Sequence, residues 1–530
     1  MGLLEKVRLA VDKDSAGPDW VILDLHGEYP TYRSTDPVQA VVRRGESFEG
    51  LVERLEKLAD AEWLRGVVVR VGDLKTGLAT SRRIGLALGR LAARKRVIGY
   101  LPQVSMRSLL TTATLAEVVA PESAEVQLPG FAAEQVFFGA FLSRHGIGFE
   151  NLRIREYKSA LTQFSEAQMD DYQREQLTAY LDSAERTWVA DVAAPRGRDG
   201  AVLDAGITSA RQLAELGLIT RIAYDDELVT TVEPSWPRTL ELLLPDLRGA
   251  RRGKKADHIA VVTVQGPIVP GRSRGLPPVP LLPGPTAGSD TVVAALRKAD
   301  RDEHVRAIVL YVDSGGGSAL ASDLIGRAVA RCSTPVVAVM GEVAGSGGYY
   351  VLAQADHVVA DPYTITGSIG VVVGKPVLAE LDERHGLRPE SVGREQALFG
   401  SPHRPFSEAD RTWAERMMEE VYARFVDRVA TGRGLSAERV DEIGRGRIWS
   451  GAAAHEIGLV DELGDLEAGL VAARRLGGLA EDAPVSAVST GFQLPGTPTF
   501  GKDAAGTLGG YWPFGTETVL TWLDHHLTIR

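Results

Sequence analysis

The two halves of this 530-residue chain repeat one another, and this repeat constrains the fold more than any other feature of the sequence. Apolar segments of the first half recur in the second half at an offset of about 240 residues. The matching pairs are WVILDLHGEYP (20–30) with HIAVVTVQGPIV (258–269), LRGVVVRVGD (64–73) with VRAIVLYVDS (305–314), RVIGYL (96–101) with VVAVMG (336–341), and LAEVVAPE (115–122) with ADHVVADP (355–362). The repeat predicts two halves of similar fold.

The order of elements within each half predicts an α/β fold. In the second half, apolar strands at 306–312, 335–340 and 357–360 alternate with a helix from about Ser318 to Ala330 and a short helix from about Ser346. Near-continuous apolar strands separated by helices favour right-handed βαβ crossovers and a parallel core sheet that is covered on both faces. We therefore expect tandem duplicated βαβ domains with parallel core sheets.

A long helix is expected in the second half, and the expected domains follow the repeat. The helix spans 407–432, and its stripe of Trp413, Met417, Val421 and Phe425 predicts a packed face. The expected parts are an N-terminal half (1–247), a basic linker (248–257), a C-terminal half (258–480) and a tail (481–530).

Three segments outside the repeat suggest particular roles. The linker, RGARRGKKAD, is interpreted as a solvated hinge, with contact to anionic lipid headgroups as the alternative. The proline- and glycine-rich segment 266–290 is interpreted as a flap or rim loop. In the tail, TVLTWLDHHL (518–527) is helix-like and is expected to dock on a partner subunit.

Composition excludes several classes of function. The net charge of −11 argues against a nucleic-acid partner, and the single cysteine, Cys332, excludes an intramolecular disulfide and a cysteine-based zinc site. The sequence has no GxxxxGK[ST] phosphate loop and no HExxH, so we expect neither a metal nor a cofactor. The N-terminus lacks the apolar core of a signal peptide or membrane anchor, so a cytoplasmic protein is expected, with peripheral membrane contact as an option.

Two glycine clusters stand where chemistry is expected. DSGGGS (313–318) and GEVAGSGG (341–348) each follow a strand of the second half. Adjacent parallel strands place their carboxyl ends side by side, where ligand sites form. Gly316 and Gly317 can offer backbone N–H groups for an oxyanion, and Ser346 can act as a nucleophile beside them.

The first half serves as an internal control for these clusters. The positions that match them are roughly GDLKTG (72–77) and VSMR (104–107), so the strands were kept while the glycines and the serine were lost. If the glycines and serine served folding alone, both halves would need them. The asymmetry favours a function for the second copy.

A serine nucleophile needs a base, and the sequence offers two candidates for that role. His357 is the nearest histidine in sequence, but it begins a strand and is interpreted as a strand residue. Lys158, in RIREYKSALTQF, follows a strand and precedes an apolar Ala-Leu, and the matching second-half segment has no lysine. Burial would lower the pKa of such a lysine toward neutrality, which a general base requires.

These motifs resemble the signal peptide peptidase A (SppA) family in its long, internally duplicated bacterial form. The similarity covers roughly residues 20–480 and is most specific in YKSALTQF, VRAIVLYVDSGGGSALAS, VVAVMGEVAGSGGYYVLAQADHVVADPYTITGSIGVV and GRIWSGAAAHEIGLVDELGD. The resemblance implies a ClpP/crotonase-like fold, a homotetramer and a serine–lysine dyad, with Ser346 as nucleophile and Lys158 as general base. It also implies an oxyanion-hole glycine at Gly316, with Gly317 beside it.

This chain departs from the family pattern in two places. Gly315 stands where the family usually has proline, and the N-terminal membrane anchor of the familiar member is not seen here. The expected function is an ATP-independent serine endopeptidase that degrades hydrophobic peptides such as cleaved signal-peptide remnants. The alternatives are a crotonase-type acyl-CoA enzyme and a non-catalytic, membrane-associated scaffold that binds peptides.

Overall fold

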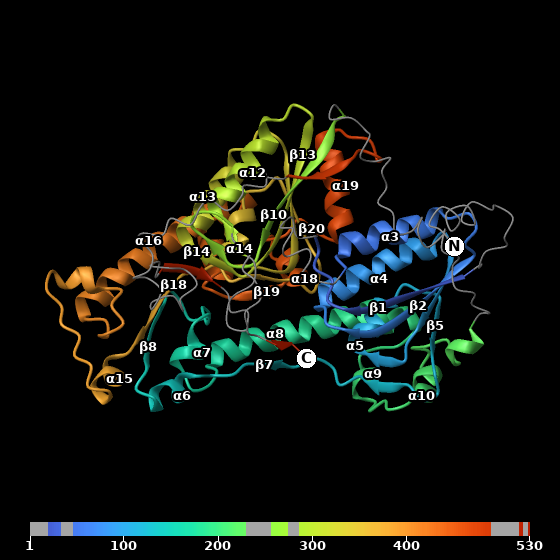
Figure 1. Cartoon of the computed structure of the whole chain (residues 1–530), viewed down its shortest axis with the longest axis horizontal. Helices are drawn as coiled ribbons and strands as arrows, with labels where there is room; N and C mark the ends of the chain where they lie inside the picture. The colour runs from blue at the N-terminus through green and yellow to red at the C-terminus, as the bar shows by residue number, and fades with distance from the viewer. Residues whose placement is uncertain are drawn as a thin grey trace, which may run out of the picture. The chain divides into compact units, whose positions relative to one another are not determined.

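The computed structural model describes residues 20–32, 46–228, 256–273, 286–488, 519–522 and 528–529. The chain divides into two compact units, shown in Figure 1. Unit 1 comprises residues 1–131 and 184–255, and unit 2 comprises residues 132–183 and 256–530. Each unit is therefore built from two stretches of the sequence.

Unit 1 contains a five-stranded sheet in which every neighbouring pair is parallel. In sheet order its strands are β1 (Trp20–Gly27), β2 (Gly66–Leu74), β3 (Arg96–Tyr100), β5 (Glu117–Ala120) and β9 (Arg221–Ile222). The connecting helices include α3 (Phe48–Asp60), α4 (Leu78–Ala92) and α5 (Met106–Thr111). The strands are apolar and mostly buried, as expected for a parallel sheet that is covered by helices.

The main sheet of unit 2 has the same order of parallel strands. Its central members are β10 (His258–Gln265), β13 (Val305–Ser314), β15 (Val336–Gly345), β16 (His357–Ala360) and β20 (Glu462–Leu463). Each pairs in parallel with the next, and the sheet is completed by β17 (Ile365–Gly367), β19 (Ile448–Ser450) and β21 (Val485–Ala487). The predicted α/β class with parallel core sheets is confirmed, and the shared strand order is consistent with duplication.

A second sheet of unit 2 carries the segment that precedes Lys158. In sheet order it contains β12 (Ala287–Gly288), β11 (Ile268–Val269), β14 (Gly316–Ser318), β22 (Val519–Trp522), β18 (Val372–Val377) and β8 (Gly148–Arg153). β8 pairs antiparallel with the whole of β18, from Arg153↔Val372 to Gly148↔Val377. This pairing places residues 132–183 in unit 2, whereas the expected boundary assigned them to an N-terminal half ending at 247.

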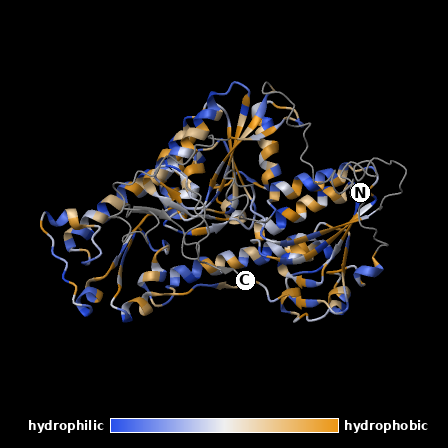
Figure 2. Cartoon of the chain, in the orientation of Figure 1, coloured by the Kyte–Doolittle hydropathy of each residue, from blue (hydrophilic) through white to orange (hydrophobic). Residues whose placement is uncertain are grey.

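Helices and strands of unit 2 enclose one large apolar core. The strands β10 and β13 pack against α12 (Ser289–Arg301), and β10, β13 and β15 pack against α19 (Leu466–Gly477). The helix α13 (Ala319–Ala330) packs against α12, and Figure 2 shows the hydrophobic strands. The predicted helix from Ser318 to Ala330 is confirmed as α13, with Ser318 as its N-cap. The expected strand at 357–360 is confirmed as β16.

The long helix α16 (Glu408–Arg433) forms where it was predicted, and three of the four residues of the predicted stripe pack against the core. Phe425 is buried, and Met417 and Val421 are partly buried against the core, whereas Trp413 keeps 46% of its surface exposed. The most buried positions also include Ala414, Met418, Tyr422, Val426 and Val429. A capping box at Ser407 fixes where the helix begins.

Several predicted segments lie partly or wholly outside the described residues. They are most of the linker 248–257, residues 274–285 of the proline-rich segment, and most of the tail. Within the tail, residues 519–522 form the strand β22, so the prediction of a helix over 518–527 was wrong there. Val519 and Leu520 are extended because they pair with β14 and β18.

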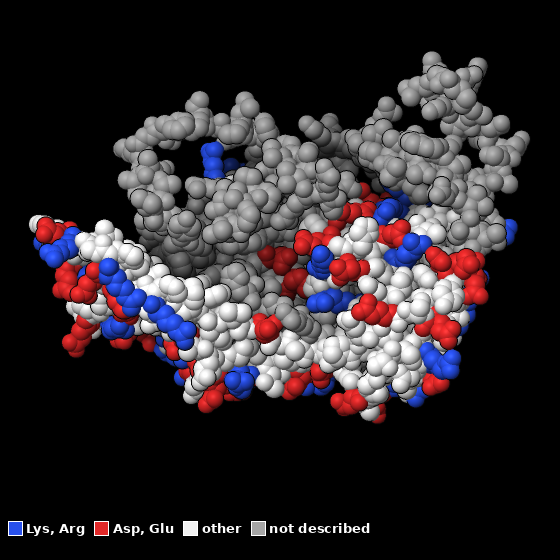
Figure 3. Space-filling view, turned by 60° about the horizontal axis from the view of Figure 1, so that its bottom comes forward, with Lys and Arg blue, Asp and Glu red and all other residues white. Residues whose placement is uncertain are grey.

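Two further properties concern the described surface. None of the described helices combines the length and the apolar character needed to cross a bilayer. On the face shown in Figure 3, acidic and basic side chains are intermixed.

Candidate active site

Ser346 lies at the junction of β15 and the short helix α14 (Gly347–Leu352). Its backbone has φ 54° and ψ −117°, a conformation that costs on the order of 1–3 kcal/mol for a residue with a Cβ. The Ser346 amide donates to Gly367 O at 2.8 Å, and Tyr350 N donates to Ser346 O at 2.8 Å. The side chain makes no capping bond, so its hydroxyl is free for another partner.

The neighbours of Ser346 explain the glycine cluster. A Cβ on Gly348 would overlap Ser314 O, so glycine is required where α14 passes the end of β13. The tyrosines that follow belong to the core: Tyr349 Oη donates to Leu459 O at 2.8 Å, and Tyr350 Oη donates to Asp323 Oδ1 at 2.6 Å. These bonds hold α14, and with it the strained turn, in place.

Lys158 reaches the same point from the loop that follows β8. Its Nζ lies 2.6 Å from Ser346 Oγ, although the two residues are 188 positions apart in sequence. Nζ also lies 3.0 Å from Ser368 Oγ and 3.1 Å from Ser368 O. Lys158 and Ser346 are both 0% exposed, so this contact is shielded from bulk water.

Burial lowers the pKa of Lys158 well below its ordinary value of 10.5. No carboxylate among the described residues forms an ion pair with it that would offset the loss of hydration. A neutral amine has two N–H groups and one lone pair. In that neutral form, Ser368 O and Oγ can accept from both N–H groups, and the lone pair can then accept the proton of the Ser346 hydroxyl.

Two glycines make room for the lysine side chain. A Cβ on Gly446, which has φ +84°, would lie 2.5 Å from Lys158 N and 2.6 Å from its Cα. A Cβ on Gly370 would lie 3.2 Å from Lys158 Cδ. The lysine is therefore enclosed by backbone, and this restricts where its Nζ can be.

Ion pairs fasten the lysine-bearing segment to unit 2. Arg155 forms a pair with Glu419 of α16 at 2.6 Å, and Glu156 forms one with Arg445 at 3.1 Å. Arg155 and Glu156 both belong to the loop between β8 and Lys158. The loop is thus held by α16 and by the turn that carries Gly446.

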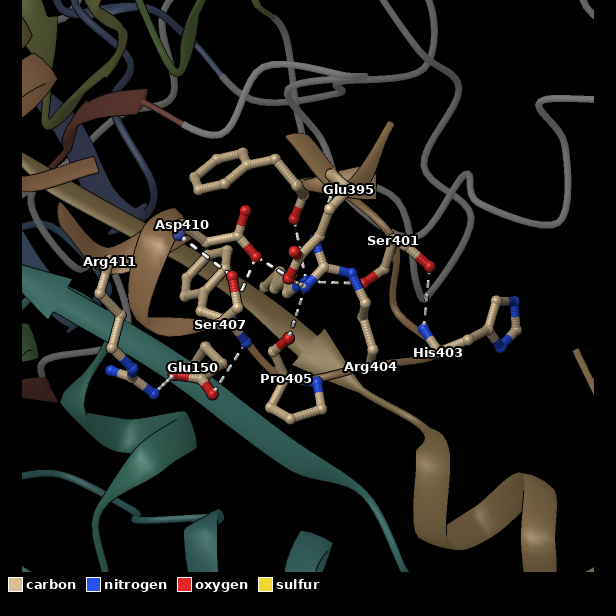
Figure 4. A network of polar contacts seen from close by, with 12 residues as sticks. Glu150, Glu395, Ser401, His403, Arg404, Pro405, Ser407, Asp410 and Arg411 are labelled. Carbon is tan, nitrogen blue, oxygen red and sulfur yellow. Dashed lines mark hydrogen bonds and ion pairs between the residues drawn. The ribbon is translucent and has the colours of Figure 1, made fainter. Parts of the chain in front are cut away.

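A polar network fastens β8 itself, as shown in Figure 4. Glu150 of β8 accepts hydrogen bonds from Phe406 N at 3.3 Å and from the Arg411 guanidinium at 2.5 Å. Arg404 in turn pairs with the buried carboxylate of Asp410 at 2.7 Å. The network joins the strand before the lysine to the start of α16.

The two glycines of β14, Gly316 and Gly317, lie in a strand that contacts α14, the helix after the serine. Gly316 N donates to Ser314 Oγ at 3.1 Å, and Ser314 Oγ donates to Gly266 O at 2.6 Å. Gly316 and Gly317 have φ values of 96° and 155°, which explains why glycine is needed at both. A Cβ on Gly317 would also overlap Ile268 O of the neighbouring strand.

Two candidate residues were not found from the sequence. Ser368 holds both N–H groups of the lysine and has φ 50°, but a lone serine in the segment ITGSIG gives no signal of this. Gly347 supplies the first amide of α14, which has no acceptor within the helix. Its position directly after the serine could have indicated it.

The other residues weighed from the sequence lie elsewhere. His357 begins β16, as expected, and its Nε2 lies 2.9 Å from Glu462 Oε2. Burial raises the pKa of Cys332 to about 12, so its thiol stays protonated. In the described part of the chain, no group of acidic, histidine or cysteine side chains could hold a metal ion.

This site joins a strained serine to a buried lysine whose pKa is lowered by burial, in a parallel α/β unit, which is an arrangement suited to serine hydrolases. Residues 90–235 and 329–479, more than half of the chain, match Peptidase family S49. The chain therefore belongs to peptidase family S49. The match in two regions is also consistent with duplication.

The chain is similar to several proteins named as proteases. It is 29% identical to a chloroplastic serine protease SPPA of Arabidopsis thaliana, over 83% of this chain and 67% of that one. It is 28% identical to protease 4 of Haemophilus influenzae, over 74% of this chain and 66% of that one. A putative signal peptide peptidase SppA of Enterococcus faecium is 34% identical over 32% of this chain and 50% of that one.

The chain spans about two thirds of the length of the first two relatives. Among solved structures, a ClpP1 mutant of Listeria monocytogenes matches at 14% identity with a TM-score of 0.24, covering 40% of this chain and 94% of the other. The family match and the relatives named as proteases support a peptidase, in agreement with the expected enzyme class.

Proposed function

We propose that this protein is an ATP-independent serine endopeptidase in which Ser346 is the nucleophile and Lys158 is the general base. The observation that carries the proposal is the 2.6 Å approach of Lys158 Nζ to Ser346 Oγ in a fully buried setting. A lysine that only stabilised the fold would be expected to pair with a carboxylate. Here the ammonium form is disfavoured, and the free base faces the hydroxyl.

The proposed reaction has two stages. Lys158 Nζ takes the proton of Ser346 Oγ as the oxygen attacks the carbonyl carbon of the scissile peptide bond. The resulting ammonium returns this proton to the leaving amine when the C–N bond breaks, which leaves an acyl-serine. Water then attacks the ester while Lys158 takes its proton, and Ser346 regains a proton as the acid product leaves.

Backbone amides stabilise the oxyanion in this proposal. Gly316 and Gly317 remain the proposed donors, and Gly347 joins them because it follows the nucleophile at the start of α14. Gly316 N must exchange its bond to Ser314 Oγ for the substrate oxygen. Ser314 would thus keep this amide partnered while no substrate is bound.

The proposed substrates are hydrophobic peptides in extended form, such as signal-peptide remnants. Support comes from the extended backbone of β14, which contacts the helix that begins after Ser346, and from the name of the Enterococcus relative. A homotetramer and a peripheral membrane contact also remain proposals. Sedimentation and binding to anionic vesicles would test them.

Hydrolysis of a fluorogenic apolar peptide tests the proposal, with Ser346→Ala and Lys158→Met compared with the wild type. Both variants should lose about 10³-fold or more in kcat, and Ser346 should react with a peptidyl fluorophosphonate only when Lys158 is present. Wild-type activity in either variant would refute the dyad. Binding of coenzyme A, together with activity that survives Ser346→Ala, would favour an acyl-CoA enzyme. Binding of the peptide without reaction of Ser346 with the fluorophosphonate would favour a scaffold.

A further inference from the structure

The helices α12 and α13 of unit 2 pack side by side, and a groove runs between them (Figure 1). Four arginines line this groove, Arg297 and Arg301 from α12 and Arg327 and Arg331 from the end of α13. All four residues are exposed. We call this feature the arginine groove.

The same spacing in both helices brings the four guanidinium groups together. Residues four positions apart in an α-helix lie on one face, with their Cβ atoms about 5–6 Å apart. Arg297 and Arg301 are such a pair, and Arg331, the C-cap residue of α13, follows Arg327 at the same interval with a helical backbone. The axes of packed helices lie about 8–10 Å apart, so the two pairs face one another across a narrow space.

The described carboxylates do not neutralise these arginines. None of the four guanidinium groups forms an ion pair or a hydrogen bond with a described side chain. Asp300 lines the groove, but its Oδ1 accepts from Ser333 N at 2.8 Å, from Ser333 Oγ at 3.0 Å and from Thr334 N at 2.9 Å. Asp290 lies seven residues before Arg297, which is about 10 Å along the helix.

Helix capping alone does not explain this arrangement. Cations near the C-terminal end of a helix complement its dipole, and Arg301 and Arg327 in the last turns of α12 and α13 fit that pattern. Two arginines on the same face of a helix repel one another, however, and the facing helix repeats the pair. A bound anion would remove this repulsion.

The wall of the groove beside the arginines is apolar. Val293, Leu324 and Ala328 line it, and Leu324 keeps 42% of its surface exposed. Val293 lies one turn before Arg297, and Leu324 lies one turn before Arg327. The groove therefore offers an apolar surface directly next to its positive charge.

The amount of positive charge selects among anions. A carboxylate carries one negative charge and pairs bidentately with one guanidinium fork. A phosphate monoester carries about −1.5 to −2 charges at neutral pH and has three acceptor oxygens, so it can bind guanidinium groups from both helices at once. Four unpaired arginines in one groove thus favour phosphate over carboxylate.

We propose that the arginine groove binds a ligand with a doubly charged phosphate group and an apolar part that lies against Leu324. Two sources offer this chemistry: soluble organic phosphates such as nucleoside diphosphates, and the headgroup of phosphatidic acid in a bilayer. The inference is independent of the proposed peptidase function, because neither Ser346 nor Lys158 lines the groove.

The first experiment titrates inorganic diphosphate into the full chain by isothermal calorimetry at constant ionic strength. The test variant is Arg297→Gln/Arg327→Gln, which removes one arginine from each helix. The matched control is Arg388→Gln/Arg424→Gln, which removes the same charge from two exposed arginines outside the groove. We expect the test variant to bind about tenfold more weakly or worse and the control to stay within about twofold of the wild type.

Two further probes define the ligand. Sedimentation with phosphatidylcholine vesicles that contain phosphatidic acid, compared with phosphatidylcholine alone, tests the lipid source. Binding of diphosphate that depends on the groove supports a soluble ligand, and binding of the acidic vesicles alone that depends on the groove supports a lipid. Failure of both probes, equal binding by the test variant, or citrate binding as tightly as diphosphate would overturn the proposal.

Thermal unfolding provides a test that separates binding from folding. Diphosphate should raise the melting temperature of the wild type and of Ser346→Ala, but not that of Arg297→Gln/Arg327→Gln. Without an anion and at low salt, this double variant should be at least as stable as the wild type, because two repulsive contacts are removed. A lower melting temperature of the double variant under these conditions would show that the arginines stabilise the fold and would overturn the proposal.

Discussion

Both units of the molecule place a serine at the start of the short helix that follows the third parallel strand, and the two serines are used differently. In unit 1, Ser105 caps α5: its Oγ accepts from Ser108 N at 3.2 Å, and Ser108 Oγ accepts from Ser105 N at 2.8 Å. The expectation that the first half had lost the serine was therefore wrong, because Ser105 rather than Met106 stands at the N-cap position that Ser346 has in unit 2. In unit 2, Ser346 stands at the N-cap of α14 without forming a cap. Its Oγ meets Lys158 Nζ instead.

The backbone explains the difference. Ser105 has φ −131°, the extended conformation usual for a capping residue, and its hydroxyl turns back onto its own helix. Ser346 has φ 54°, which points the hydroxyl away from the helix amides. One unit uses its serine to stabilise a helix, and the other gives up that stabilisation to make a hydroxyl available.

The largest expected contrast is in activity. Ser346→Ala should reduce kcat about 10³-fold or more, whereas Ser105→Ala should leave kcat within about twofold, because its hydroxyl contacts only its own turn. Initial rates on a fluorogenic peptide provide the measurement. A large loss of activity in Ser105→Ala with an unchanged melting temperature would contradict the assignment of a purely structural role to Ser105.

A glycine substitution should show how closely the lysine must be held. Gly446→Ala would bring a Cβ to 2.5 Å from Lys158 N, and the forced shift of Nζ should lower kcat about 10²-fold. Gly217 in unit 1 is the matched control, since it also has positive φ but nothing within 4 Å of its Cβ position. Gly217→Ala should lower the free energy of unfolding by about 1 kcal/mol or more with kcat unchanged.

The buried lysine should also make stability depend on pH. In the unfolded chain the pKa of Lys158 returns to 10.5, while in the folded chain burial holds it well below that value. At pH values between the folded and the unfolded pKa, Lys158 is protonated in the unfolded chain but not in the folded chain. The free energy of unfolding therefore rises with pH by about 1.4 kcal/mol per pH unit in this range, and the rise ends above the unfolded pKa.

Lys158→Met should abolish this slope and raise the stability at neutral pH, as measured by urea unfolding at a series of pH values. Burial lowers the pKa of a second lysine, Lys375, to about 8, so its own contribution arises above that pH. The comparison of Lys158→Met with the wild type is therefore best made below pH 8. A slope that persists in Lys158→Met would show that the lysine is charged in the folded protein.

The smallest expected effect is the loss of the cap itself. Ser105→Ala should lower the free energy of unfolding by about 1 kcal/mol, because it leaves Ser108 N without its acceptor. Ser346→Ala loses no capping bond, so the stability that it loses should come from the contact with Lys158 Nζ and should disappear in a Lys158→Met background. A loss that persists in that background would contradict this difference between the two turns.

Sequence reasoning reached the strands and the two principal site residues because they leave patterns of their own. Apolar runs mark β13 and β15, and the glycines around Ser346 are absent from the matching part of unit 1. The absence of a lysine from the second-half counterpart of residues 153–164 pointed to Lys158. Each of these signals is contained in a short stretch of sequence.

The remainder depends on pairings between distant segments. Ser368 and Gly446 are recognisable only when the lysine is seen between them, and the assignment of residues 132–183 to unit 2 follows from the pairing of β8 with β18. The strand β22 was misjudged as a helix for the same reason, since its extended form comes from β14 and β18 rather than from its own sequence.

The discontinuity of unit 2 has a consequence for biosynthesis. β8 and Lys158 leave the ribosome long before β18, their partner strand, has been made, and Gly446, which encloses the lysine, is made later still. A chain grows at about 5–20 residues per second, so the lysine spends many seconds as an ordinary, hydrated and charged side chain. A nascent molecule therefore carries Ser346 and Lys158 before the surroundings that bring them together exist, so under the proposed mechanism an unfinished chain has no peptidase activity.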